Sequence, residues 1–341
     1  MTGGLLAVHA HPDDETLATG ALLATWAASG RAVTVVTCTR GERGEVIALP
    51  GTASAGLENL EGDRSALAAH RATELAQALD ALGDGAIDHL FLDSVPDLVD
   101  GSALEGPAGH RGPDTRWEDS GMTWVAPGIA GPAPDAQSSA FVRVPLDDAA
   151  ARLATVVRER RPAVVVTYEP GGGYRHPDHV RAHAVAVRAL DLAADPTAAL
   201  PGEPWEVPER WEAVVGESRL RDARRALAAA PTVTELAHRA GMTFPDPDEA
   251  LPPVAMPDDG IADAVEVAVA PVLDRVLRGL RAHATQVQHV TELPAPVPLT
   301  SHTGGQLLGC FALSNGVLAP LLDRETYAVR PGRAPRVGSA R

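Results

Sequence analysis

Lysine is missing from this chain of 341 residues, and all 29 of its basic residues are arginines. Enzymes that form a Schiff base through a lysine, or that bind phosphate through the lysine of a phosphate loop, are therefore excluded. The arginines are outnumbered by 45 acidic residues, so the formal net charge is −16. Binding to nucleic acid depends on neutralising phosphates, and a surface of this charge excludes it as a partner.

Cysteine and long apolar runs are also scarce. The two cysteines, Cys38 and Cys310, are far apart and form no C-x-x-C pair, which excludes a zinc site built from thiolates. No run approaches the roughly 20 apolar residues of a membrane span, and no basic stretch opens the chain as in an export signal. We therefore expect a cytoplasmic protein without membrane contact; the sequence does not specify an oligomeric state.

Aromatic residues make up only 4% of the chain, so alanine, valine and leucine must build most of the core. Short β-branched runs alternate with segments of helical spacing, which predicts an α/β protein with a mostly parallel, Rossmann-like sheet and helices on both faces. The predicted strands cover residues 5–9, 33–39, 87–92, 163–168 and 211–215, and the predicted helices cover 15–29, 64–82, 148–160 and 177–192.

Two long stretches interrupt this alternation. Residues 94–146 and 230–260 are rich in glycine, proline and aspartate and show no sustained periodicity. Long irregular stretches in a compact domain are often functional loops. We expect the first to cover the active site and the second to be a peripheral excursion.

The remainder of the chain predicts one more strand over 262–269 and one more helix over 271–287. No linker divides the sequence sharply. We therefore predict a catalytic portion over 1–195 and a smaller C-terminal α/β portion over 196–330 that completes the same unit. The tail, 331–341, is predicted to be disordered.

Two clusters of polar residues each follow a predicted strand. Residues 9–15 read His-Ala-His-Pro-Asp-Asp-Glu, and residues 168–179 end in His-Pro-Asp-His. In an open α/β sheet, ligands bind at the carboxyl ends of the strands, so both clusters are expected at one edge of the sheet. Together they predict a site with chemical function.

The residue types in these clusters suit a metal. A catalytic zinc ion takes three protein ligands and leaves a position for water, whose pKa it lowers towards about 7. Two imidazoles and one carboxylate supply such a set, from His11, His179 and Asp14. The adjacent Asp13 is then free to act as general base. We predict one divalent metal, Zn²⁺ or else Fe²⁺, and His176 remains open as a ligand or an acid.

Other residues nearby have competing interpretations. His9 lies inside the strand and is expected to be packed or to support a ligand. His183, one helical turn beyond His179, is a weaker candidate ligand. Glu15 either favours the helix dipole or bonds to a ligand, and the glycines at 171–173 suggest a lid or a tight turn more than a phosphate loop.

The pairing of Ala-His-Pro-Asp-Asp-Glu with His-Pro-Asp-His resembles the LmbE-like (PIG-L) deacetylases. These are zinc-dependent amidases that remove acetyl groups from N-acetylglucosamine units. Further segments resemble the branch of that family in mycothiol biosynthesis, which acts on N-acetyl-glucosaminyl-inositol; they lie at residues 35–47, 117–122, 164–170, 283–287 and 314–315.

The resemblance implies a role for each matching residue. The metal ligands would be His11, Asp14 and His179, with Asp13 as general base. His176 would stabilise the oxyanion and help to protonate the amine, Asp178 would orient His176, and Tyr174 would polarise the carbonyl from a mobile loop. Arg71, Asp119 and Met122 would hold the sugar and inositol hydroxyls of a small amino-sugar substrate.

Several alternatives remain at this point. Arg175 stands where the family has a small residue, which leaves room for a deacetylase of a glycosylated natural product. The sister amidase that cleaves mycothiol S-conjugates has a lysine shortly after the first motif, and this chain has none. Two histidines and a carboxylate also suit a non-haem iron oxygenase, but those sites sit in β barrels. An inactive binding scaffold would be expected to lose a ligand or the base.

Overall fold

A computed structural model describes residues 3–96, 116–126, 129–300 and 304–332. Its main sheet has the strand order β3-β2-β1-β6-β7-β13-β9, with β8 paired to β7. The parallel strands are β1 (Leu5–His9), β2 (Val33–Thr37), β3 (Ile87–Phe91), β6 (Val164–Tyr168), β7 (Glu209–Gly216) and β8 (Ala255–Met256). The antiparallel strands are β13 (Arg324–Pro331) and β9 (Val265–Ala268). The predicted α/β fold with a mostly parallel sheet is confirmed.

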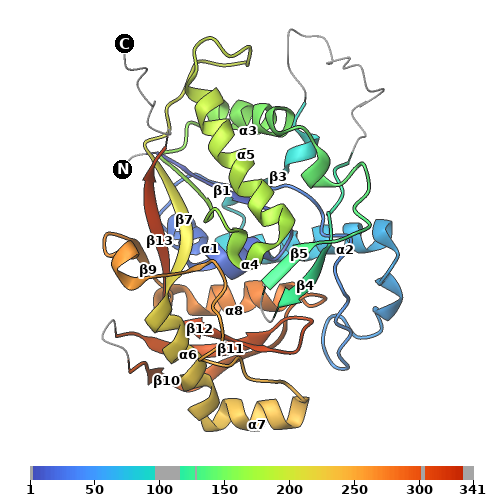
Figure 1. The fold of residues 1–341 in the computed structure, drawn as a ribbon, viewed down its shortest axis with the longest axis vertical. Helices are drawn as coiled ribbons and strands as arrows, with labels where there is room; N and C mark the ends of the chain where they lie inside the picture. The colour runs from blue at the N-terminus through green and yellow to red at the C-terminus, as the bar shows by residue number, and fades with distance from the viewer. Residues whose placement is uncertain (1–2, 97–115, 127–128, 301–303, 333–341) are drawn as a thin grey trace.

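Helices cover both faces of this sheet (Figure 1). On one face, α1 (Asp14–Ala28), α2 (Arg64–Gly83) and α8 (Leu273–Ala282) pack against Leu5 and Ala7 of β1. On the other face, α3 (Leu146–Arg160) and α5 (Pro177–Ala194) pack against Leu6 and Val8. Since neighbouring residues of a strand point to opposite faces, β1 is apolar on both faces from Leu5 to Val8, and all of its residues are buried.

A smaller sheet lies at the end of the molecule opposite α3 (Figure 1). It consists of β10 (Gln288–Pro298), β11 (Gln306–Ala312) and β12 (Leu318–Leu322) in antiparallel order. The helices α6 (Glu217–Ala229) and α7 (Pro231–Ala240) share a hydrophobic core with it. The remaining elements are the hairpin β4 (Met122–Ala126) with β5 (Ile129–Pro132) and the single turn α4 (Gly172–Arg175).

Several predicted boundaries were wrong. The stretch 230–260 begins with a helix, α7, rather than a loop, because the apolar face of Pro231–Ala240 packs on the small sheet. The predicted helix over 271–287 ends at Ala282, and a turn then leads into β10. Pro331, the first residue of the predicted tail, pairs with Glu209 of β7. Residues 333–341, on which the rest of that prediction falls, lie outside the described part of the chain.

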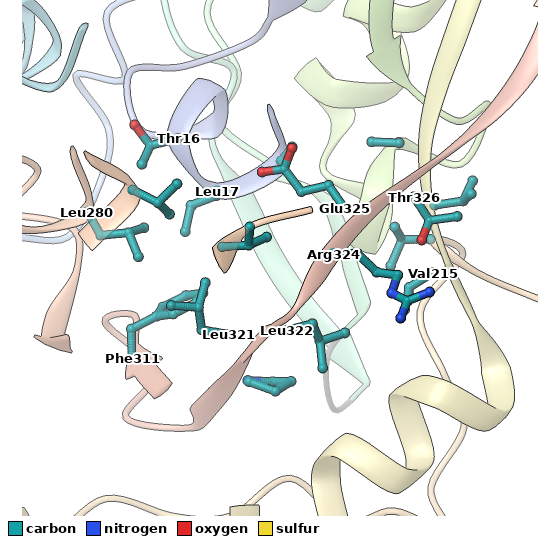
Figure 2. Close-up of a pocket in the computed structure, with 17 residues that line it drawn as sticks. Thr16, Leu17, Val215, Leu280, Phe311, Leu321, Leu322, Arg324, Glu325 and Thr326 are labelled. Atoms are coloured by element: carbon teal, nitrogen blue, oxygen red, sulfur yellow. The ribbon is translucent and has the colours of Figure 1, made fainter. Parts of the chain in front are cut away.

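Strand β13 anchors helix α1 at its middle. The buried Glu325 carboxylate accepts hydrogen bonds from the backbone N–H groups of Ala21 (2.7 Å) and Leu22 (2.9 Å). The Tyr327 hydroxyl donates to the same carboxylate at 2.6 Å. Glu325 borders a mainly apolar cavity of 240 Å³ between α1, α8, β13 and the small sheet (Figure 2). Burial raises the pKa of Glu325 to about 7.

Among the described residues, no helix combines the length and the apolar character that crossing a bilayer requires.

Candidate active site

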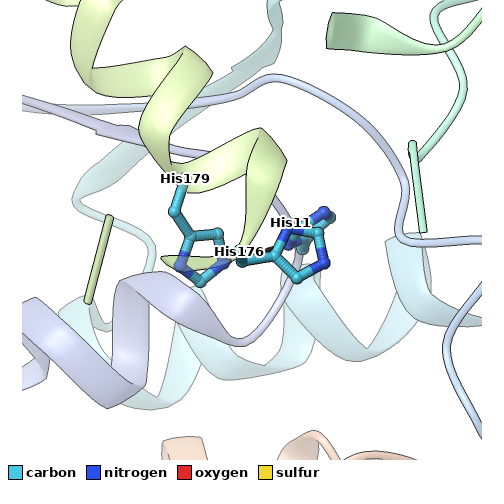
Figure 3. A group of neighbouring side chains, drawn as sticks. All are labelled: His11, His176 and His179. Carbon is cyan, nitrogen blue, oxygen red and sulfur yellow. Dashed lines mark hydrogen bonds between the residues drawn. The ribbon is translucent and has the colours of Figure 1, made fainter. Parts of the chain in front are cut away.

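The two polar clusters meet at the carboxyl edge of the main sheet. Strands β1 and β6 are neighbours with Ala7 opposite Val166, so the loops that follow them emerge side by side. Helix α1 begins at Asp14 and α5 at Pro177, directly after these loops. The imidazoles of His11, His176 and His179 consequently lie together at the start of α5 (Figure 3).

The side chains of His11, Asp14 and His179 present donor atoms in the arrangement that a metal needs. His11 Nδ1 lies 3.4 Å from Asp14 Oδ2, His179 Nε2 lies 3.3 Å from Asp14 Oδ1, and the two nitrogens are 3.3 Å apart. A tetrahedral zinc ion with bonds of about 2.0–2.1 Å requires its ligand atoms to be about 3.3 Å apart. The two nitrogens have this spacing, and each of them lies 3.3–3.4 Å from a different oxygen of the Asp14 carboxylate.

The charges around His11 also fit a cation. Although burial lowers it, the pKa of His11 is raised well above its ordinary value by the carboxylates of Asp119, Asp14 and Asp178. Several buried carboxylates around one point are unfavourable unless a positive charge lies among them. A divalent ion at this point would supply that charge.

His11, His176 and His179 form a second group with donor nitrogens within 4.8 Å of one another. The rings of His176 and His179 are stacked, with centroids 4.8 Å apart and planes inclined by 29°. The Asp14 carboxylate contacts both His11 Nδ1 and His179 Nε2, whereas His176 lies against these two residues ring to ring. The geometry therefore favours Asp14 over His176 as the third ligand.

Asp178 contacts His11 rather than His176 through its carboxylate. Its Oδ2 lies 3.3 Å from His11 Nε2 and accepts the backbone N–H of Ser120 at 2.8 Å. A carboxylate at Nε2 keeps the proton there and leaves Nδ1 free for a metal. The backbone N–H of Asp178 donates to His176 Nδ1 at 3.1 Å, so these two residues are joined through the main chain, and the orienting role of Asp178 stays a prediction.

That backbone contact fixes the state of His176. Because Nδ1 accepts a hydrogen bond, the neutral ring carries its proton on Nε2. Burial lowers the pKa of His176 well below its ordinary value, and the neighbouring His11 and His179 lower it further. His176, which lines the pocket, is therefore a neutral hydrogen-bond donor.

Asp13 lies at the junction between the loop and α1 with an unusual backbone. Its φ is +109°, a region that residues with a side chain rarely adopt. Burial raises the pKa of Asp13 to about 6, although the Arg71 guanidinium, 3.2 Å from Asp13 Oδ2, lowers it. A carboxyl with a pKa near neutrality is suited to accept and return a proton.

Arg71 mainly holds the loops at the strand ends together. It is buried, and its guanidinium donates to the backbone oxygens of Gly41 (2.6 Å) and Pro12 (2.5 Å) as well as to Asp13. It also lines the pocket, so the predicted contact with substrate stays a prediction.

Tyr174 approaches the cluster from a loop rich in glycine. Gly172 has a φ of +66°, and a Cβ there would lie 2.6 Å from the backbone nitrogen of Val180, so only glycine fits. The Glu169 carboxylate accepts the N–H groups of Gly171 and Gly173. These groups are therefore not free to bind phosphate, and the expected tight turn is confirmed.

Two other segments hold this loop. The exposed Trp124 of β4 stacks on Tyr174 with ring centroids 5.6 Å apart. The N–H of Val254 donates to the backbone oxygen of Gly173 at 2.9 Å, and Pro252 lines the pocket. The segment 230–260 is therefore not peripheral throughout, because its end supports the loop of Tyr174.

The cluster opens into a pocket of 410 Å³. Among the predicted residues, His11, Asp13, Asp14, Arg71, Asp119, Met122, Tyr174 and His176 line it. Residues without a predicted role also line it, namely Leu17, Arg43, Gly44, Glu45, Gly121, Trp124, Pro252, Gln286, Leu313, Ser314 and Asn315. Glu45, Gln286 and Ser314 fall in segments that carried the family resemblance, which was the available signal.

Two further histidines, His9 and His183, lie outside the contacts among His11, Asp14 and His179. His9 was expected to be packed or to support a ligand, and His183 was a weaker candidate ligand. His9 is buried with its Nε2 3.0 Å from Thr19 Oγ1, which fits a packed residue. His183 has its Nδ1 2.8 Å from the backbone oxygen of Tyr168. That contact occupies Nδ1 alone, so the weaker candidacy of His183 as a ligand stays a prediction.

An α/β sheet with convergent imidazoles and carboxylates in a polar pocket at its strand ends is typical of metal-dependent hydrolases. A family model described as GlcNAc-PI de-N-acetylase (PIG-L) matches residues 6–190. The chain belongs to this family, which confirms the resemblance inferred from its motifs.

Curated relatives match nearly the whole chain. A 1D-myo-inositol 2-acetamido-2-deoxy-α-D-glucopyranoside deacetylase of Kineococcus radiotolerans is 41% identical over 97% of this chain and 78% of its own length. A protein of the same name from Rhodococcus erythropolis is 40% identical over 98% of this chain and 93% of its own. The solved structure of the N,N'-diacetylchitobiose deacetylase from Pyrococcus horikoshii is 15% identical in sequence to this chain. The match covers 83% of this chain and 70% of that one, and its TM-score of 0.44 is too low to transfer structural detail.

Proposed function

We propose that this protein hydrolyses the acetamide of N-acetyl-glucosaminyl-inositol, releasing acetate and the free amine in mycothiol biosynthesis. The observation that carries the proposal is the set of contacts at 3.3–3.4 Å among the side chains of His11, Asp14 and His179, beside the Asp13 carboxyl and a pocket for a small polar molecule. The substrate is the one that the curated relatives are named for.

The metal would be held by His11, Asp14 and His179, with the Asp178 carboxylate fixing the His11 ring. Zinc suits two imidazoles and a carboxylate, and Fe²⁺ accepts the same set. When bound, such an ion acidifies a water molecule and polarises the amide carbonyl.

The chain's own residues handle protons and charge. Asp13 removes a proton from the attacking water as the new C–O bond forms, and the Nε2–H of His176 donates to the developing oxyanion. Tyr174 contributes its hydroxyl at the carbonyl. As the C–N bond breaks, the proton that Asp13 took from the water passes to the leaving nitrogen, which departs as the free amine.

The sugar and the inositol need hydrogen-bonding partners in the pocket. Arg71, Asp119 and Met122 line it, together with Arg43 and Gln286. Asp119 is held by hydrogen bonds from its N–H to Glu42 (3.0 Å) and from the Gly121 N–H to its carboxylate (2.7 Å). A fixed carboxylate and guanidinium groups are suited to a pair of sugar hydroxyls.

We place the reaction in the cytoplasm, which the two buried and unpaired thiols, Cys38 and Cys310, support.

The test compares two substrates of the wild-type enzyme and then compares the wild type with one variant. Wild type should release acetate from N-acetyl-glucosaminyl-inositol faster than it cleaves a mycothiol S-conjugate. The variant Asp13→Ala should keep its metal but lose roughly 10²–10⁴-fold in rate, as expected for the loss of a general base. Normal turnover by that variant would refute the assignment of Asp13, and faster cleavage of the S-conjugate would refute the substrate.

A further inference from the structure

The backbone of Asp13 is held in an unfavourable conformation by groups on either side of it. A φ of +109° is costly for a residue with a side chain and persists only where its surroundings impose it. On one side, Arg71 donates to the oxygen of Pro12. On the other side, the N–H of Asp13 donates to Glu15 Oε2 at 3.0 Å.

Glu15 is in turn fixed by a residue from the far end of the chain. Its Oε1 lies 2.7 Å from His283 Nε2 and accepts the Thr16 hydroxyl at 2.5 Å. Both Glu15 and His283 are fully buried, with 0% exposure. His283 begins the turn between α8 and β10, where its backbone oxygen accepts the N–H groups of Gln286 and Val287. Its position is therefore set by the C-terminal half of the fold.

Neither residue lines the substrate pocket. An effect on the reaction would therefore pass through Asp13 and not through substrate contact. Without the Glu15 acceptor, the Asp13 N–H would be left without a partner, and the strained φ would lose one of its two restraints. Relaxation to a negative φ would turn the Asp13 carboxylate away from the pocket.

We propose that His283, acting through Glu15, is a positioning residue that keeps the Asp13 carboxylate directed into the active site. This inference rests on the proposed role of Asp13 as general base. It adds a residue from near the C-terminal end of the chain to the machinery of a site whose proposed metal ligands all lie before residue 180.

Two polar variants at one position separate this role from simple core packing. In His283→Gln, the amide nitrogen reaches the place of the imidazole Nε2 and can still donate to Glu15. In His283→Asn, the shorter side chain places its amide near the position of Nδ1, so the bond to Glu15 is lost. The control is Thr285→Val on the same turn, which removes the buried hydroxyl bond to Glu74 (2.7 Å) but no link to Asp13.

We expect His283→Asn to lower kcat by about 10–100-fold, the usual effect of losing a supporting partner, with KM and metal content within about twofold of wild type. His283→Gln should recover most of the rate, and Thr285→Val should keep it even where its Tm falls. In the Asp13→Ala background, His283→Asn should cause no further loss. A wild-type kcat for His283→Asn, or an equal loss in Thr285→Val, would overturn the proposal.

Crystal structures of the two His283 variants give a readout that does not depend on the substrate. The φ of Asp13 should become negative in His283→Asn and stay positive in His283→Gln. An unchanged positive φ in His283→Asn would overturn the positioning role by itself. If wild type released no acetate while φ responded as expected, the proposed function would fail and the positioning role would stand.

Discussion

Glu325 connects the last strand of the main sheet to the middle of α1, the helix that begins with the metal-binding motif. Its carboxyl is buried and accepts hydrogen bonds from two N–H groups of α1 and from Tyr327. The substitution Glu325→Gln replaces this carboxyl by a neutral amide of the same shape. It is expected to change how the stability of the protein depends on pH.

The pKa of Glu325 gives both the sign and the size of this pH dependence of stability. Burial raises the pKa of Glu325 from 4.5 to about 7 in the folded state. Between these values the folded protein holds a proton that the unfolded chain has lost, so wild type loses stability as the pH rises. A shift of this size corresponds to about 3 kcal/mol in total, of which about 2.5 kcal/mol is lost between pH 5 and pH 8.

The assay is urea unfolding of wild type and Glu325→Gln at four pH values between 5 and 8. The free energy of unfolding of the variant, relative to wild type, should rise by about 2–3 kcal/mol across this range. The exposed Glu235 of α7 provides a matched control, and Glu235→Gln should show no such trend. Parallel curves for wild type and Glu325→Gln would refute the reasoning.

Two further substitutions test the surroundings of the site. Asp178→Asn removes the charge that holds His11 Nε2, and metal affinity measured by competition with a chelator should fall about 10–100-fold; unchanged affinity would show that Asp178 does not support the ligand. Trp124→Ala removes the ring stacked on Tyr174, and kcat/KM should fall about 2- to 10-fold, the usual value of one aromatic pair; an unchanged kcat/KM would show that Tyr174 needs no such support.

The N-terminal half of the fold could be predicted because its pattern is local. Strands β1, β2 and β6 are buried on both faces and read as continuous apolar runs, separated by helices with a clear periodicity. The strands after residue 287 gave no comparable signal. β10 contains three prolines, at 294, 296 and 298, which normally argue against a strand. The strand tolerates these prolines because it lies at the edge of the small sheet, where one side of the strand has no partner strand to bond among the described residues.

The candidate site was likewise predictable only where its signal is local in the sequence. The metal motifs are short and follow strands, so residues such as His11 and His179 could be assigned from spacing and chemistry. The contacts that fix them join distant parts of the chain, as in the bond between Glu15 and His283 across 268 positions. Such contacts depend on how the C-terminal half folds back, which no local pattern encodes. The contact between the Asp178 carboxylate and His11 likewise joins residues 167 positions apart.

The metal content of single variants tests the central assignment most directly. Wild type, Asp14→Ala, His179→Ala and His176→Ala would be stripped with a chelator, dialysed against Zn²⁺ and analysed for bound zinc. The contacts of Asp14 with His11 and His179 predict one zinc per chain for wild type and for His176→Ala, and loss of that zinc in the other two. Full zinc in Asp14→Ala together with its loss in His176→Ala would contradict the account.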